Sequence, residues 1–131
     1  MYNDINNGVY KTGFATTQEV YDKEVDNLFA ALDRLEKLLS DGREYLVPEI
    51  GSSEADIRLY PTLVRFDVAY HTLFRCNVKM IRHEYPYIHA YLRRLYWKEE
   101  AFKKWTNFDH IKKGYSRVGG NKGIEPRGPL P

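Results

Sequence analysis

The chain has 131 residues, a formal net charge of +2 and one cysteine. This length fits one domain that buries about two-thirds of its unfolded surface. The balanced charge gives no argument for nucleic acid as a partner, and one cysteine excludes an internal disulfide. No apolar run approaches the roughly 20 residues that cross a bilayer, and no signal peptide is visible, so we expect a soluble cytoplasmic protein without a membrane partner.

The first clear helix is predicted to begin at a capping box formed by Thr16 and Glu19. Apolar residues then recur at spacings of four and three, which places them on one helical face. They are Tyr21, Val25, Leu28, Leu32, Leu35 and Leu39. Gly42 is expected to provide a left-handed residue at the C-terminal end. Such a stripe is typical of packing within a helical bundle.

A second capping box, Ser53 with Asp56, opens the stretch SSEADIRLYPTLVRFD. It predicts a long helix that runs into the Phe74 region and is the most buried of the domain, because apolar residues fall on several of its faces. We interpret Asp56 as a structural capping residue rather than a catalytic carboxylate. Pro61 lies beyond the first turn, so a kink is expected there.

Two charges, Arg65 and Asp67, lie inside this otherwise apolar helix, and we expect an ion pair or a carbonyl contact for them. A third helix is predicted to start near Pro86, with an apolar face of Ile88, Tyr91, Leu92 and Leu95. A short segment around Phe102 and Trp105 and a last helix through Ile111 to Tyr115 follow. No strand pattern is present, so the predicted fold class is all-α, a helical bundle.

Several segments, in order, resemble one family. SSEADIRLYPTLVRFD resembles the start of the central buried helix in the C-terminal domain of glutathione transferases, and is most similar to the omega-like glutathionyl-hydroquinone reductases, the Xi class. Three other segments are similar to parts of the same family. The interdomain segment and first helix of the family are similar to NNGVYKTGFATTQEVY, and a later helix is similar to YPYIHAYLRRLYW. The last helix and tail of the family are similar to TNFDHIKKGYSRV and NKGIEPRGP. The resemblance implies an interdomain linker remnant over 1–15, the all-α domain over 16–118 and an irregular tail over 119–131.

The resemblance also implies a function. In this family a thioredoxin-like N-terminal domain carries the glutathione site and a nucleophilic cysteine. That cysteine attacks the sulfur of a glutathionyl-hydroquinone, the hydroquinone leaves, and a second glutathione resolves the mixed disulfide. This chain corresponds to the C-terminal half, which supplies the aromatic-substrate wall and much of the dimer contact. We therefore expect three partners: a thioredoxin-like domain, a hydroquinone-type substrate and a second copy of this chain. We expect glutathione to be bound mainly by the thioredoxin-like domain, and this chain alone to have no activity.

Two tyrosines are the candidate substrate-binding residues. Tyr10 in NGVYKTGF and Tyr115 in IKKGYSRV match two family tyrosines that face the aromatic substrate. Without the resemblance each would be an ordinary packing tyrosine. A phenol hydroxyl suits this task because it donates and accepts hydrogen bonds while its ring packs on a flat substrate.

No catalytic residue and no metal site are predicted in this chain. Cys76 is expected late in a helix, and Arg75 does not share its face, so we interpret Cys76 as structural. The histidines have no zinc-ligand spacing; they are His71, His83, His89 and His110. Acidic residues interleave the basic pairs, which favours solvated helix faces over a nucleic-acid surface.

Two other interpretations stay open at this stage. Glutathione-transferase-like C-terminal domains also occur as non-catalytic protein-interaction modules, which is the rival interpretation. A third interpretation is that the sequence is a truncated gene model. An in-frame thioredoxin-like domain with its cysteine upstream of Met1 would identify the chain as part of the enzyme.

Overall fold

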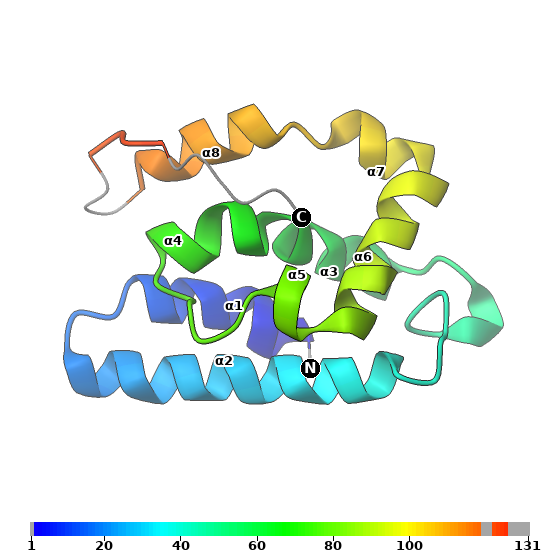
Figure 1. Ribbon diagram of the computed structural model, residues 1–131, viewed down its shortest axis with the longest axis horizontal. Coiled ribbons are helices and arrows are strands. Elements are labelled where there is room, and N and C mark those ends of the chain that lie inside the picture. The colour runs from blue at the N-terminus through cyan, green and yellow to red at the C-terminus, as the bar shows by residue number, and fades with distance from the viewer. Residues whose placement is uncertain (1, 119–121, 126–131) are drawn as a thin grey trace.

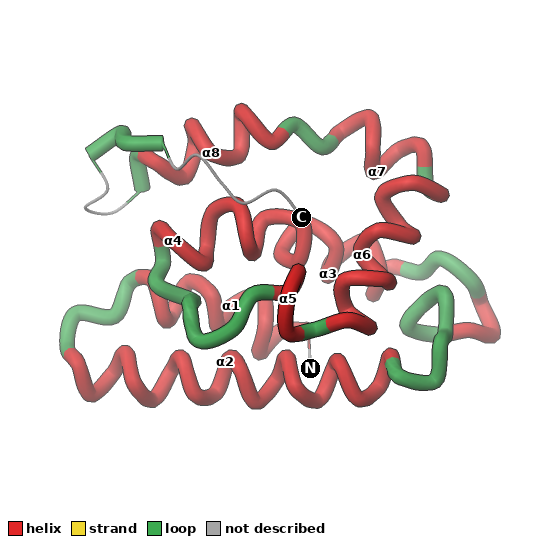
Figure 2. Tube along the Cα trace, in the orientation of Figure 1, coloured by secondary structure: helices red, strands yellow, loops and turns green. Residues whose placement is uncertain are grey.

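The computed structural model describes residues 2–118 and 122–125. In chain order its helices are α1 (Tyr2–Gly13), α2 (Gln18–Leu39), the short 3₁₀ helix η1 (Pro48–Ile50), α3 (Glu54–Arg65), the π-helical η2 (Phe66–Tyr70), α4 (His71–Leu73), α5 (Ile81–Glu84), α6 (Pro86–Lys98), α7 (Glu100–Trp105) and α8 (Phe108–Ser116). These residues contain no strand (Figure 2), which confirms the predicted all-α fold. The predicted irregular tail lies partly outside them; residues 122–125 form no helix.

The helices are arranged around one central segment. Helix α2 runs along one side of the molecule with α1 packed on it, and α7 and α8 run along the opposite side (Figure 1). The continuous helical segment α3–η2–α4 lies between them, and all five residues of η2 are buried. This confirms that the helix opening at Ser53 is a deeply buried element that reaches the Phe74 region.

Helix α2 begins one residue later than predicted. Its N-cap is Thr17, whose Oγ1 accepts a hydrogen bond from the amide of Val20 at 3.2 Å. The predicted Thr16–Glu19 capping box is therefore wrong: the cap lies one residue later, and Val20 has no side-chain oxygen that could complete a box. Both threonines carry a suitable oxygen, and only the backbone, extended at Thr17, decides between them. The predicted stripe is buried from Val25 to Leu39, and Gly42 has the expected positive φ of 81°.

Helix α1 lies where the sequence interpretation placed only an interdomain segment. Ile5, Val9 and Thr12 are completely buried, at spacings of four and three. Gly8 allows close packing, because a Cβ there would lie 3.2 Å from Cδ1 of Leu28 on α2. The apolar pattern is only two residues long before Thr12, and Gly8 lowers helix propensity, so the sequence gives little signal for this helix.

The Ser53–Asp56 capping box is present as predicted. Asp56 is completely buried and accepts from the amide of Ser53 at 3.0 Å, the amide of Leu46 at 2.9 Å and the hydroxyl of Tyr91 at 2.6 Å. One carboxylate thus joins the preceding loop, α3 and α6. Helix α3 runs through Pro61 to its last residue without interruption.

The two charges inside the central segment have different partners. Arg65 donates to the carbonyl of Pro61 at 3.2 Å, which is the expected carbonyl contact. Asp67 forms neither an ion pair nor a carbonyl contact among the described residues: its two oxygens accept from the amides of Ile81 and Arg82, each at 2.9 Å. A buried carboxylate here caps the start of α5, because those amides have no partner within the helix.

Candidate functional site

Three tyrosine hydroxyls meet at one end of the domain. Tyr10 is on α1, Tyr70 is the last residue of η2, and Tyr115 is on α8. The Tyr115 oxygen lies 2.9 Å from that of Tyr10 and 2.9 Å from that of Tyr70, and the Tyr10 and Tyr70 oxygens are 3.4 Å apart. We call these residues the tyrosine cluster. The structure thus brings together both tyrosines singled out in the sequence, and adds Tyr70.

The solvent exposure of the cluster residues increases from the core to the surface. Tyr70 is 1% exposed, whereas Tyr10 is 40% exposed. The rings of Tyr70 and Tyr115 meet edge to face at 5.1 Å between centroids. Buried Phe74 contacts all three tyrosine rings, at 5.3 to 5.7 Å. The ring of Phe14, 53% exposed, packs on both Phe74 and Tyr10. Fixed rings therefore hold the hydroxyls in place, and aromatic surface extends to the outside.

A glycine makes this packing possible. Gly13 ends α1, and a Cβ at this position would lie 2.5 Å from Cγ of Phe74. That distance is far below van der Waals contact, so the close approach of α1 to Phe74 requires a residue without a side chain.

The hydroxyls of Tyr70 and Tyr115 keep their protons at neutral pH. Burial raises the pKa of Tyr70 well above its ordinary value, and the hydrogen bonds to Tyr10 and Tyr115 act in the same direction. Burial also raises the pKa of Tyr115. In a closed triangle each hydroxyl donates once and accepts once, which leaves one lone pair on each oxygen. The cluster can therefore accept from, or re-orient to donate to, a phenolic oxygen placed beside it.

A cavity of about 470 Å³ adjoins the cluster at Tyr115. It lies between α3 and the α7–α8 side of the bundle, and its walls include the stacked rings of Tyr60 and Phe102, 4.3 Å apart. The remaining lining residues are Ile57, Pro61, Val64, Arg65, Trp105, Thr106, Asn107, His110, Ile111 and Gly114. Tyr10 is not part of this lining. The cavity is large enough for a ligand of one or two rings.

The surroundings of Cys76 do not suit a nucleophilic thiol. It follows α4 in a loop, after Arg75 at φ 57°, and so is not late in a helix as predicted. The left-handed residue ends the helix there, and the amide of Cys76 donates to the carbonyl of Tyr70 at 3.0 Å. Its side chain is completely buried, and burial raises the pKa of the thiol to about 12. A thiol in this state supports the structural interpretation.

Other kinds of site find no support among the described residues. Over 2–118 and 122–125, no three histidine, cysteine or acidic side chains are grouped so as to hold a metal ion. In the same part of the chain, no helix has the length and apolar character needed to span a membrane.

Tyr70 was not predicted as a site residue. It stands in FDVAYHTL, within the apolar run of the central segment, and its ring is as buried as its neighbours. A buried tyrosine there is indistinguishable from a core residue until the positions of Tyr10 and Tyr115 are known. The only available signal was its polar hydroxyl, which needs a partner when buried.

Comparison with known proteins identifies relatives along the whole chain. The family profile "Glutathione S-transferase, C-terminal domain" matches residues 18–94. Glutathione S-transferase omega-like 3 of Saccharomyces cerevisiae is 46% identical over 151 aligned residues, which cover 100% of this chain and 41% of that protein. Glutathionyl-hydroquinone reductase YqjG of Escherichia coli is 43% identical, covering 98% of this chain and 37% of that protein. The chain thus spans less than half the length of these relatives.

Solved structures agree with the sequence matches. The crystal structure of the glutathione S-transferase Xi from Phanerochaete chrysosporium superposes with a TM-score of 0.90 at 48% identity, covering 99% of this chain and 42% of that one. The glutathione-bound structure of YqjG from Escherichia coli gives a TM-score of 0.89 at 42% identity, with 99% and 42% covered. Fold and sequence together show that this chain belongs to the family of glutathione S-transferase C-terminal domains.

Proposed function

We propose that the chain forms the aromatic-substrate-binding and dimerisation domain of a glutathione-dependent transferase of the glutathionyl-hydroquinone reductase type. The observation that supports this most strongly is the tyrosine cluster, in which three hydroxyls from three separate helical elements lie 2.9 to 3.4 Å apart. Similarity to relatives named glutathionyl-hydroquinone reductases supplies the chemical class of the substrate.

The proposed role of the cluster is to hold the hydroquinone and stabilise it as it leaves. The two outer hydroxyls, of Tyr10 and Tyr115, bind the hydroquinone oxygens, and Tyr70 orients them from the core. A hydroxyl with a raised pKa keeps its proton, so it can donate to an oxygen that gains negative charge as the carbon–sulfur bond breaks. The exposed rings of Tyr10 and Phe14 offer a flat surface for the aromatic ring.

The cluster does not itself suit glutathione. A tripeptide with two carboxylates and an ammonium group calls for charged partners, whereas the cluster offers phenol hydroxyls and the rings of Phe14 and Phe74. We therefore assign glutathione mainly to a thioredoxin-like domain that docks against this end of the bundle, with the nucleophilic cysteine on that domain. In this arrangement the present chain contributes no catalytic cysteine.

The test uses a chimera in which this chain replaces the corresponding region of the Escherichia coli glutathionyl-hydroquinone reductase. Tyr10→Phe or Tyr115→Phe should lower kcat/KM for a glutathionyl-hydroquinone by about tenfold or more, because a hydrogen bond to a charged oxygen contributes about 1.5–3 kcal/mol. Tyr87→Phe is the matched control, since Tyr87 is 47% exposed on α6 outside the cluster, and should leave kcat/KM unchanged.

Two results would contradict the proposal. One is a chimera that folds and binds glutathione yet gives no turnover. The other is turnover that neither cluster substitution alters; this would return both tyrosines to packing roles and favour the alternative, a non-catalytic protein-interaction module. The dimerisation part is tested separately by light scattering of the chain, which should give the mass of two copies.

A further inference from the structure

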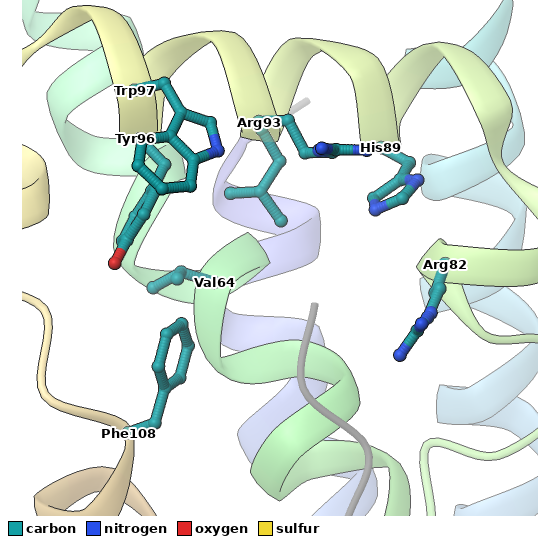
Figure 3. Close-up of a pocket in the computed structure, with 8 residues that line it drawn as sticks. Val64, Arg82, His89, Arg93, Tyr96, Trp97 and Phe108 are labelled. Carbon is teal, nitrogen blue, oxygen red and sulfur yellow. The ribbon is translucent and has the colours of Figure 1, made fainter.

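A second cavity lies outside the tyrosine cluster. Its volume is about 270 Å³, and it is formed by α6 with contributions from α3, α5 and α8. Figure 3 shows its two unlike sides: aromatic rings gather on one side, and nitrogen-bearing side chains gather on the other. The lining residues are Val64, Arg82, His89, Leu92, Arg93, Tyr96, Trp97 and Phe108. We call it the cationic pocket.

The aromatic side offers ring surface to a ligand. Tyr96 packs edge to face against Trp97 with centroids 5.1 Å apart, and lies 6.3 Å from the ring of Phe108. Val64 and Leu92, 3% and 2% exposed, close the pocket toward the core. A single aromatic ring entering here would replace water on apolar and aromatic surface.

The opposite side is lined by two arginines and a histidine. His89 and Arg93 are one turn apart on α6, and Arg82 comes from α5. Asp67 is the acidic residue that acts on His89. Both oxygens of Asp67 already accept hydrogen bonds from the two amides at the start of α5.

The electrostatic state of His89 agrees with this arrangement. Burial lowers the pKa of His89 below its ordinary value, Arg93 lowers it further, and Arg82 and His83 act in the same direction against Asp67. Neighbouring cations thus make a further positive charge unfavourable at this point. Burial disfavours a charge of either sign, so it is the effect of these neighbouring cations on His89 that favours an anion here.

We propose that the cationic pocket binds a small, single-ring aromatic anion, such as an aromatic carboxylate or a phenolate. The ring lies against Tyr96, Trp97 and Phe108, and the anionic oxygens face Arg93 and His89. A planar guanidinium suits such oxygens, because it donates two parallel hydrogen bonds to a carboxylate. A volume of about 270 Å³ is near the lower limit of small-molecule sites, which restricts the ligand to one ring.

The direct test is a titration of the ¹⁵N-labelled 131-residue chain with benzoate, followed by NMR, with benzamide as the neutral control of equal shape. Benzoate should shift the resonances of His89, Arg93 and the Trp97 indole, should raise the pKa of His89, and should bind at least tenfold more tightly than benzamide. Equal affinity for the two compounds would overturn the proposal, as would shifts confined to the tyrosine cluster.

A variant separates the pocket from general surface charge. Arg93→Gln, at an exposed residue, should weaken benzoate binding about tenfold, whereas Lys23→Gln, which removes an exposed charge from α2, should not. The amide spectrum of each variant reports whether it is folded, and His89→Gln provides an independent second variant. Equal weakening by Arg93→Gln and Lys23→Gln would mean general anion attraction and overturn the assignment. None of these readouts involves turnover, so this proposal and the proposed function can fail separately.

Discussion

The hydroxyl oxygen of Tyr115 lies 2.9 Å from that of Tyr10, although 105 positions separate them in the chain. The contact joins a side chain of α1 to one of α8, the first and last of the described helices. Tyr70 completes the contact from the core, 2.9 Å from Tyr115. The cluster therefore has a structural part in the core and an outer part that we propose faces a ligand, and the two parts can be tested separately.

Tyr70→Phe tests the structural part. It keeps the ring contacts but removes the hydroxyl that lies beneath the other two, so we expect a loss of about 1 kcal/mol in the free energy of unfolding. Denaturant unfolding of the 131-residue chain measures it, with Tyr87→Phe as the exposed control. A variant as stable as the native chain would show that the buried hydroxyl contributes nothing to folding.

Gly13→Ala tests the contact between α1 and Phe74. The new methyl would lie 2.5 Å from Cγ of Phe74, so we expect a loss of about 1–3 kcal/mol in stability. Gly114→Ala is the matched control in α8, where a Cβ would meet nothing within 4 Å. Because alanine is the better helix former, Gly114→Ala should raise stability by up to about 1 kcal/mol. Thermal or urea unfolding would reveal the opposite signs, and equal effects would contradict the close approach.

Asp56→Ala should destabilise far more than Ser53→Ala. Loss of the serine cap costs about 1 kcal/mol. Loss of the carboxylate leaves the buried hydroxyl of Tyr91 and the amide of Leu46 without their partner, for which we expect roughly 3 kcal/mol or more. Glu54→Ala, which removes an exposed ion pair with Arg58, should change stability by no more than about 0.5 kcal/mol. Urea midpoints rank the three variants; Ser53→Ala as costly as Asp56→Ala would contradict the joining role of Asp56.

Cys76 should be unreactive toward a disulfide reagent at pH 8 in the folded chain and reactive in denaturant, because its thiol is buried with a pKa of about 12. The folded pKa lies above the ordinary value of 9.0, so the folded thiol stays protonated where the unfolded thiol ionises. This contribution to stability is complete below pH 9.0 and is lost as the pH rises toward about 12.

Comparison of the native chain with Cys76→Ala over the same pH range checks the sign. The stability difference in favour of the native chain should shrink as the pH rises above 9.0. We also expect no thiol-transferase activity from the isolated chain, and turnover that Cys76→Ser abolishes would contradict the structural role of this cysteine.

Local signals in the sequence were enough to predict a helix start or a buried helix face where nearby residues determine the backbone. Pro86 at the start of α6 and the Ser53–Asp56 box at the start of α3 were predicted at the right residues. The regular stripe from Val25 to Leu39 defined the buried face of α2. In these cases the relevant partners lie within a turn or two, so sequence spacing carries the information.

The features that were predicted wrongly or missed depend on partners far away in the sequence. Asp67 accepts from amides 14 and 15 residues further along the chain, so its role depends on where α5 packs. Helix α1 is stabilised by burial against α2 rather than by its own propensity. The pairing of Tyr10 with Tyr115 was predicted only through family resemblance, and Tyr70 not at all, because its role depends on positions that only the tertiary structure defines.

The π-helical turn η2 has a consequence for how this site can change over evolutionary time. A π-turn holds one more residue than the α-helical turn it interrupts, and such turns recur at functional sites. Tyr70 is the last residue of η2. Because the wider winding of η2 takes up this extra residue, α4 and Phe74 beyond it keep the direction that an uninterrupted helix would give them. Deletion of a single residue between Phe66 and Tyr70 would therefore restore ordinary α-helical winding without turning Phe74 away from the cluster. The same deletion within the α-helical part of α3 would rotate all following residues by about 100° around the helix axis, so a one-residue gap in a homologue keeps the packing at Phe74 only where it falls in η2.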